Sequence, residues 1–319
     1  MKAIGEATND LEAMAEQVLS SIAEWQGREM SYEVAAVAVV SPIHRAVESA
    51  CFNVTLDGED LFLKARYPDM AAFFDDAAIA KSCESAGQVG VAPALRYSDT
   101  NRGILVFDRL GEDWTWGRVD TFADPALLET LVGAKKRIHE VPAFDQTRSV
   151  FDCIERYWTM AQTEQVTLPS DLPSILAQVR RFGEAIAASG VDQRPCHGDG
   201  VTSNVMVGPQ AAVRLVDFDM AANSDPYHDL GSLMVELFQF DEDDRQVLEI
   251  YDGSFDEARY NRCRLYGIAD DLMWALWGFI CFKLSPRKGV EFTKYAEWRL
   301  LRCRWHLGHP AYERWLARL

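Results

Sequence analysis

The sequence lacks the signatures of several protein classes. Its seven cysteines are widely scattered, and no two show the CxxC spacing of a zinc or redox site. The first residues, Met1–Leu19, lack the apolar core of a signal peptide. No apolar run approaches the roughly 18 residues that a membrane-spanning helix needs, and the stretch from Trp274 to Phe282 is typical of a buried helix. We therefore expect a cytoplasmic protein with reduced thiols.

Positive charge is also scarce. The chain has 32 Lys and Arg residues against 49 Asp and Glu residues, which gives a formal net charge of −17. Such a surface repels nucleic acid and anionic membranes, so we expect neither as a partner. It suits a small cationic ligand, although an acidic balance is more often only a solubility feature. Hydrophobic residues make up 48% of the chain, which is enough for a sizeable core.

The chain changes character along its length. At 319 residues it exceeds the usual size of one compact domain, so we expect two lobes. Apolar periodicity predicts an opening helix at 11–22, strands at 34–40, 51–56, 61–65, 94–97 and 103–107, and a helix at 70–86. Later helices are predicted at 124–139, 150–162, 172–189, 230–238, 245–251, 255–282 (broken somewhere) and 292–306. The expected fold class is α+β: a strand-rich N-terminal lobe (1–110), a hinge near 108–111, and a larger, mainly helical lobe (111–319).

One strand-rich island, Asn204–Asp219, interrupts the later helices. Its apolar runs, 204–207 and 212–216, flank Gly208-Pro209-Gln210 and should pair as a hairpin. Asn204 and Asp217 then meet at its open end, and Asp199 lies five residues before Asn204. Two acids and an amide form a hard-oxygen site that suits Mg²⁺. A catalytic acid, an Asn five residues later and an Asp after the next strand also follow the logic of phosphoryl transfer. The alternative is a set of ordinary turn residues that cap a hairpin.

These residues carry a family resemblance. His197-Gly198-Asp199 with Asn204, then Val216–Asp219, then Asp225-Pro226 and Asp229-Leu230-Gly231, resembles the aminoglycoside phosphotransferase and choline kinase superfamily. The resemblance implies a bilobal, protein-kinase-like fold with ATP and Mg²⁺ as cofactors. It implies Asp199 as catalytic base, His197 as a brace of the catalytic loop, and Asn204 and Asp217 as Mg²⁺ ligands. Asp219 either assists the metal or is a plain loop acid, and Asp229 is expected to hold the loop through backbone hydrogen bonds.

The same resemblance suggests how the N-terminal lobe would bind the nucleotide. Lys64 ends an apolar strand and resembles the lysine that grips the α- and β-phosphates, with Asp76 as its first candidate partner and Glu84 as the alternative. A loop within 41–50, without a GxGxxG motif, would cover the phosphates. Phe107 and Leu110, near the hinge, would line the adenine pocket. An ordinary buried strand and exit turn would place the same residues there.

The acceptor would bind in the helical lobe. Trp274 and Trp277 share one helix face, and such pairs are usually core residues. Together with 283–285 and Tyr295-x-x-x-Arg299, however, they resemble choline and ethanolamine kinases. This implies that both tryptophans and Tyr295 enclose a methylated ammonium group, with Glu236 and Phe240 nearby.

The acceptor stays open at this stage. Val201 departs from the Gln that eukaryotic members of the family commonly carry, and the segment 225–229 resembles the bacterial phosphotransferases instead. We expect choline or ethanolamine first, other amino alcohols second and aminoglycosides third. A catalytically inactive, kinase-like binding protein is the rival from another class. A homodimer is also compatible with the sequence.

Overall fold

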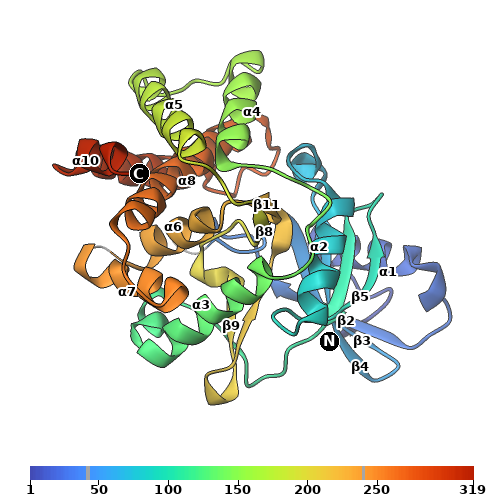
Figure 1. The fold of residues 1–319 in the computed structure, drawn as a ribbon. Coiled ribbons are helices and arrows are strands. Elements are labelled where there is room, and N and C mark those ends of the chain that lie inside the picture. Colours follow the sequence, from blue (N-terminus) through green and yellow to red (C-terminus); the bar gives the residue numbers. More distant parts are fainter. Residues whose placement is uncertain (41–43, 239–240) are drawn as a thin grey trace.

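The N-terminal part is built around one antiparallel sheet of six strands (Figure 1). The computed structural model describes residues 1–40, 44–238 and 241–319. The strands follow the order β1 (Lys2–Ala3), β2 (Met30–Ala36), β3 (Ser49–Leu56), β4 (Glu59–Arg66), β6 (Ile104–Asp108) and β5 (Leu95–Asp99). Short 3₁₀ turns cover Ala23–Trp25 and Pro68–Phe73.

Alternation along β4 gives this sheet two different faces. Leu61 and Leu63 join the core beneath α1 (Asp10–Ser21), whose Ala15 and Leu19 are fully buried there. Phe62 and Lys64 point the other way, into a cavity that faces the rest of the molecule. The helix α2 (Asp76–Gln88) packs on that second side. One strand thus supplies both the core and the site.

The C-terminal part is mainly helical and covers the left and top of Figure 1. Its helices are α3 (Pro125–His139), α4 (Val150–Thr163), α5 (Leu172–Ala188), α6 (Pro226–Leu237), α7 (Asp241–Asp252), α8 (Glu257–Leu284), α9 (Phe292–Leu307) and α10 (Tyr312–Ala317). Its strands are β7 (Thr115–Trp116), β8 (Arg194–Cys196), β9 (Val205–Val207), β10 (Val213–Leu215) and β11 (Ala222–Ser224). Further 3₁₀ turns lie at Val119–Ala123, Thr202–Asn204, Pro209–Ala211 and Phe218–Met220.

The long helix α8 forms the centre of the C-terminal part and packs against α4, α6 and α9. By length and composition it could cross a membrane, but 94% of its most apolar window is buried inside the protein. The predicted break in this helix is wrong, because α8 runs unbroken for 28 residues. Its Gly267 lies against α6, where a Cβ atom would be 3.0 Å from the carbonyl oxygen of Gly231. Glycine here permits a close helix crossing and does not interrupt the helix.

Two other element boundaries differ from expectation. The predicted helix over 70–86 is a 3₁₀ turn followed by α2, because the Asp75 carboxylate caps α2 by accepting from the amides of Ala77 and Ala78. The strand predicted over 34–40 lies earlier, at Met30–Ala36. The expected α+β, bilobal, protein-kinase-like fold is confirmed, with a strand-rich N-terminal part and a helical C-terminal part. The division of the chain at residue 110 stays a prediction. All seven cysteines are free and buried.

Candidate active site

A tight loop after β8 carries His197, Gly198 and Asp199. Gly198 has φ of +77°, and a Cβ atom there would lie 2.3 Å from the carbonyl oxygen of Met220, so only glycine fits. The His197 ring lies between two backbone carbonyl oxygens, with Nδ1 3.0 Å from that of Asp199 and Nε2 2.9 Å from that of Val216. It joins the loop to the end of the hairpin, as expected of a brace.

The carboxylate of Asp229, in the first turns of α6, holds the same loop from behind. It accepts hydrogen bonds from the backbone amides of His197 (2.9 Å) and Gly198 (2.8 Å), in agreement with the role expected from the sequence. Lys135 Nζ lies 3.2 Å from one of its oxygens and His139 Nε2 lies 3.0 Å from the other. Burial alone would raise the pKa of Asp229, but Lys135 and His139 outweigh it and hold this pKa well below the ordinary value.

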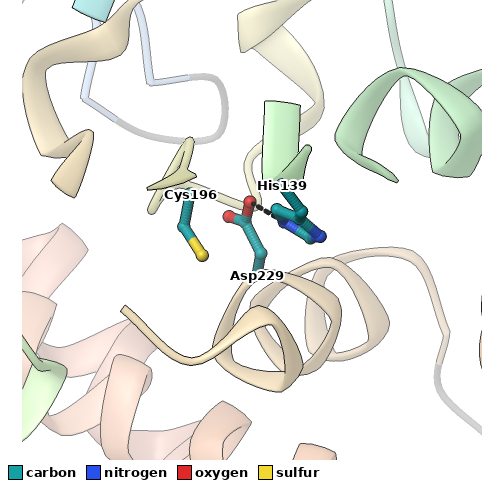
Figure 2. A group of neighbouring side chains, drawn as sticks. All are labelled: His139, Cys196 and Asp229. Atoms are coloured by element: carbon teal, nitrogen blue, oxygen red, sulfur yellow. Dashed lines mark hydrogen bonds and ion pairs between the residues drawn. The ribbon is translucent and has the colours of Figure 1, made fainter. Parts of the chain in front are cut away.

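Figure 2 shows Asp229 and His139 of this group together with Cys196. The ligating atoms of His139, Cys196 and Asp229 all lie within 4.8 Å of one another, close enough for a metal ion. Two of these side chains, however, already have hydrogen-bond or ion-pair partners within the protein. The Lys135 ammonium occupies the neighbourhood of the carboxylate, and the Tyr251 hydroxyl lies 2.8 Å from His139 Nδ1. We interpret the group as a structural support of the catalytic loop.

The Asp199 carboxylate is buried and held by two donors. One oxygen accepts from the Val201 amide and the other from Asn204 Nδ2, each at 2.9 Å. Burial raises the pKa of Asp199 to about 6, and the opposing contribution of His197 is smaller. A fixed carboxylate whose pKa lies close to neutrality is well suited to accept a proton from a bound hydroxyl group.

The hairpin β9–β10 brings Asn204 and Asp217 to its open end, as the sequence predicts. Val205 pairs with Leu215, and the Val216 amide donates to the Asn204 carbonyl oxygen at 2.9 Å. Asp217 follows directly with a left-handed φ of 65°, which turns the chain out of the strand. The two predicted metal ligands thus flank the end of one short ladder, with Asp199 bonded to the first of them.

Lys64 reaches this cluster from the N-terminal sheet. Its Nζ atom lies 2.7 Å from Asp217 Oδ1 and 3.4 Å from Asp219 Oδ1. Burial alone would lower the pKa of Lys64, but the two carboxylates raise it above its ordinary value. Lys64 is therefore a buried ammonium that joins the two parts of the molecule at the candidate site.

The expected pairing of Lys64 with Asp76 is wrong. Asp76 accepts from Arg66 at 2.7 Å, and Arg66 also forms a very short ion pair with Asp219. Arg66 lies two residues after Lys64 on β4, so both side chains point to the same face of the sheet. On that face Arg66, and not Lys64, forms the ion pair with Asp76 of α2. Arg66 and Lys64 outweigh burial and lower the pKa of Asp219, which acts here as the link between both cations.

The donor set fits a divalent cation. Asn204 and Asp217 offer hard oxygen ligands, and Asp219 is a third carboxylate nearby. Burial, followed by the charge of Asp219, raises the pKa of Asp217 to about 6. Crowded, buried carboxylates of this kind gain from a bound cation, because it stabilises their ionised form.

A cavity of about 290 Å³ lies between the sheet and the hairpin. The predicted nucleotide and metal residues that line it are Lys64, Phe107, Leu110, Asn204 and Asp217. Arg45 and Ala46 line it too, so the described end of the predicted loop 41–50 borders the cavity; residues 41–43 lie outside the described part of the chain. The hinge residues 108–111 form another wall.

The predicted acceptor residues form an aromatic box. The Trp274 and Trp277 rings of α8 lie 5.3 Å apart between centroids, and the Tyr295 ring of α9 lies 6.3 and 6.0 Å from them. Gly278 allows this approach of the two helices, because a Cβ atom there would lie 2.9 Å from Ala296 Cβ. Burial raises the pKa of Tyr295, and the charge of Asp199 adds to the rise against the larger opposing charge of Arg299.

The two remaining predicted acceptor residues differ in outcome. Glu236 lies beside the catalytic loop, with one oxygen 3.4 Å from the Thr202 amide and the other 3.4 Å from Arg302. Its charge is therefore shared with an arginine that sequence reasoning missed. Phe240 lies outside the described residues.

His44, which the sequence did not single out as a site residue, lies among the box rings. Its ring centroid is 5.7 Å from Trp274, 5.6 Å from Trp277 and 5.0 Å from Tyr295. No periodic pattern marks His44, since it lies in a loop between strands. Arg66, by contrast, could have been found from its i, i+2 spacing to Lys64.

Comparison with known proteins identifies the family. The model of the phosphotransferase enzyme family (APH) matches residues 47–266. A curated relative, "Uncharacterized protein MG356 homolog" of Mycoplasma pneumoniae, is 21% identical over 64% of this chain; the match spans 65% of that relative's length, just under two thirds.

Solved structures share the fold over nearly the whole chain. A choline/ethanolamine kinase family protein from Mesorhizobium loti has a TM-score of 0.78 at 23% identity and covers 97% of this chain and 98% of its own. Choline kinase LicA from Streptococcus pneumoniae has 0.75 at 17%, covering 92% and 99%. Aminoglycoside phosphotransferase APH(3'')-Id from Streptomyces rimosus, in complex with ADP and streptomycin, has 0.58 at 18%, covering 83% and 99%. With the family model matching more than half of its length, this chain belongs to the phosphotransferase enzyme family.

Proposed function

We propose that the protein is an ATP- and Mg²⁺-dependent kinase that phosphorylates the hydroxyl group of an amino alcohol, with choline or ethanolamine as the leading acceptors. The observation that carries the proposal is the buried Asp199 carboxylate, which is bonded to Asn204 in the wall of the cavity. The same loop bonds through Ser203 to His44, whose ring lies among the aromatic rings. The base, the nucleotide cavity and a cation-binding box are thus adjacent.

The nucleotide would bind in the cavity of about 290 Å³, with its adenine beside Phe107 and Leu110 and its phosphates near Lys64. The solved relative that holds ADP supports this choice of ligand. Asn204 and Asp217 would hold Mg²⁺, which neutralises phosphate oxygens in phosphoryl transfer. Lys64 would then exchange part of its contact with Asp217 for the phosphates.

Asp199 would act on the acceptor. Its two hydrogen-bond donors leave it oriented, so it positions the acceptor hydroxyl for in-line attack on the γ-phosphate and takes up the proton. Most of the rate enhancement would come from such positioning and from charge neutralisation.

The acceptor class rests on two observations. Three aromatic rings at centroid distances of 5.3 to 6.3 Å suit a methylated ammonium group, which gains from aromatic faces without hydrogen bonds. The fold is also more similar to the choline-type neighbours, with TM-scores of 0.78 and 0.75, than to the aminoglycoside phosphotransferase with 0.58.

An ADP-release screen tests the proposal. The acceptors are choline, ethanolamine, their methylated intermediates, other amino alcohols and aminoglycosides, each with ATP and Mg²⁺. Asp199→Asn should lower kcat by about 10³-fold or more and leave nucleotide binding nearly unchanged, because the lost group accepts the proton. Asp145→Asn is the matched control, since this carboxylate is exposed and forms an ion pair with the exposed Lys81.

Three results would change the assignment. Turnover retained in Asp199→Asn would remove Asp199 as the base. A preference for aminoglycosides that survives Trp274→Ala would favour the aminoglycoside branch. Binding of ATP without ADP release from any acceptor would favour a kinase-like binding protein.

A further inference from the structure

The aromatic box already contains a side chain of the protein itself. His44 comes from the loop between β2 and β3, more than 200 residues away in sequence, and its ring lies 5.0 to 5.7 Å from all three box rings. The side chain is buried. In the proposed function, this is the place where the acceptor's cationic group would bind.

The segment from His44 to Glu48 is anchored to the C-terminal part at two points. The His44 carbonyl oxygen accepts from Ser203 Oγ of the catalytic loop at 2.6 Å, and the Val47 carbonyl oxygen accepts from Arg287 at 2.7 Å. Within the segment, His44 Nε2 lies 2.6 Å from Glu48 Oε1. The histidine is thus presented to the box together with its own buried carboxylate.

This pair has the chemistry of a bound organic cation. Burial alone would lower the pKa of His44, but Glu48 outweighs it, and Asp199 adds to the rise against the opposing charge of Arg299. Burial alone would raise the pKa of Glu48, whereas the neighbouring His44 lowers it. A cation-binding site offers its ligand aromatic rings and a carboxylate, and the His44 ring has both as neighbours: three aromatic rings at 5.0 to 5.7 Å and Glu48 at 2.6 Å.

The fit of His44 in the box is incomplete. Among the buried polar atoms of the described residues, His44 Nδ1, Trp274 Nε1 and Trp277 Nε1 have no hydrogen-bond partner. Buried donors without partners destabilise the arrangement that leaves them so. If the histidine left the box, one of these unpartnered atoms, His44 Nδ1, would no longer be buried there.

We propose that His44 is an internal occupant of the acceptor box, and that an acceptor binds by displacing it, so that the His44–Glu48 pair determines the affinity and selectivity of the site. This inference rests on the proposed function and deepens it. When the imidazolium leaves, the Glu48 carboxylate loses its partner and becomes available to the incoming cation. One cation is exchanged for another, and neutral alcohols, which cannot replace the charge, are disfavoured.

Calorimetric titration with tetramethylammonium chloride and with choline tests this directly. Tetramethylammonium has no hydroxyl group, so its binding reports on the box independently of phosphoryl transfer. His44→Ala should bind both cations about tenfold more tightly than the unmodified protein, because the competing side chain is gone. His309→Ala is the matched control: this ring stacks on Trp315 at 4.6 Å, near the C-terminus, and its removal should leave both affinities unchanged.

His44→Gln keeps the proposal testable if His44→Ala does not fold, which thermal unfolding followed by circular dichroism will show. Glutamine removes the ring and the charge but fills much of the space, and it should also tighten cation binding. Weaker or unchanged binding in the folded variants would overturn the proposal, because His44 would then be a wall of the site or irrelevant to it.

The two proposals fail differently. Tighter tetramethylammonium binding by His44→Ala, without phosphorylation of choline, would support the internal occupant and contradict the choline kinase assignment. Phosphorylation of choline with an unchanged KM in His44→Ala would support the kinase and refute the internal occupant.

Discussion

Replacing Asp229 by Asn tests how much the brace behind the catalytic loop stabilises the protein. The carboxylate is fully buried. It accepts hydrogen bonds from two backbone amides and forms ion pairs with the Lys135 and His139 side chains. Asn keeps the shape and one acceptor oxygen, but it leaves the buried Lys135 ammonium without its counter-charge. Breaking a buried ion pair in this way costs about 3–5 kcal/mol, a large part of a typical stability of about 5–15 kcal/mol.

Urea unfolding followed by tryptophan fluorescence at pH 7 measures this loss. The double variant with Lys135→Met should recover part of it, since the unpaired ammonium is removed, and the exposed Asp145→Asn should change stability by less than about 0.5 kcal/mol. The pH dependence has a definite sign. Because the pKa of Asp229 is lowered from 3.8 in the folded state, its contribution is full above about pH 4 and declines as the pH falls further.

A loss below about 1 kcal/mol in Asp229→Asn, or no recovery in the double variant, would refute this reasoning. The loop would then be held mainly by the His197 ring and by the left-handed turn at Gly198.

Two further predictions follow from the site. The pKa of Asp199 is raised to about 6, and only the ionised carboxylate accepts a proton. With saturating ATP and Mg²⁺, so that the bound cation keeps Asp217 ionised, kcat/KM for the acceptor should fall about tenfold per pH unit below pH 6 and level off above it. A flat profile down to pH 5 would count against Asp199 as the base. Gly278→Ala should destabilise the protein by about 1–3 kcal/mol in thermal unfolding, because the new Cβ would lie 2.9 Å from that of Ala296. Gly133 of α3 has open space around it, so Gly133→Ala should be neutral or stabilising by up to about 1 kcal/mol. Equal effects of the two substitutions would contradict the packing argument.

The candidate active-site cluster was predictable because its geometry is local. A hairpin with a short turn fixes which residues meet at its open end, so Asn204 and Asp217 could be placed from their spacing alone. Asp199 is only five residues from Asn204, and the chain between them is short enough to keep both at one point.

The errors arose where the outcome depends on contacts between distant segments. Whether Lys64 or Arg66 pairs with Asp76 is decided by how α2 packs on the sheet, and the sequence of β4 offers both cations on one face. A break was predicted within 255–282, yet α8 is continuous, and its glycines Gly267 and Gly278 lie at close crossings with α6 and α9.

The position of His44 illustrates the same limit more strongly. Its neighbours in the box come from α8 and α9, more than 200 residues later, and nothing in the loop sequence encodes that contact. Three-residue strands such as β8 and β11 were also missed, because Pro195 and polar residues at 223–224 hide any alternation.

The seven buried thiols can report where the protein opens locally, because each is protected while its surroundings stay folded. Cys51 and Cys83 line the cavity between the sheet and the hairpin, and burial raises the pKa of Cys51 to about 12. Cys303 lies in α9 and Cys263 in α8, both buried in the helical part. A thiol reagent can modify each of them only when its surroundings open. The order in which they react would therefore rank the opening free energies of the two lobes in one labelling experiment, without any introduced label.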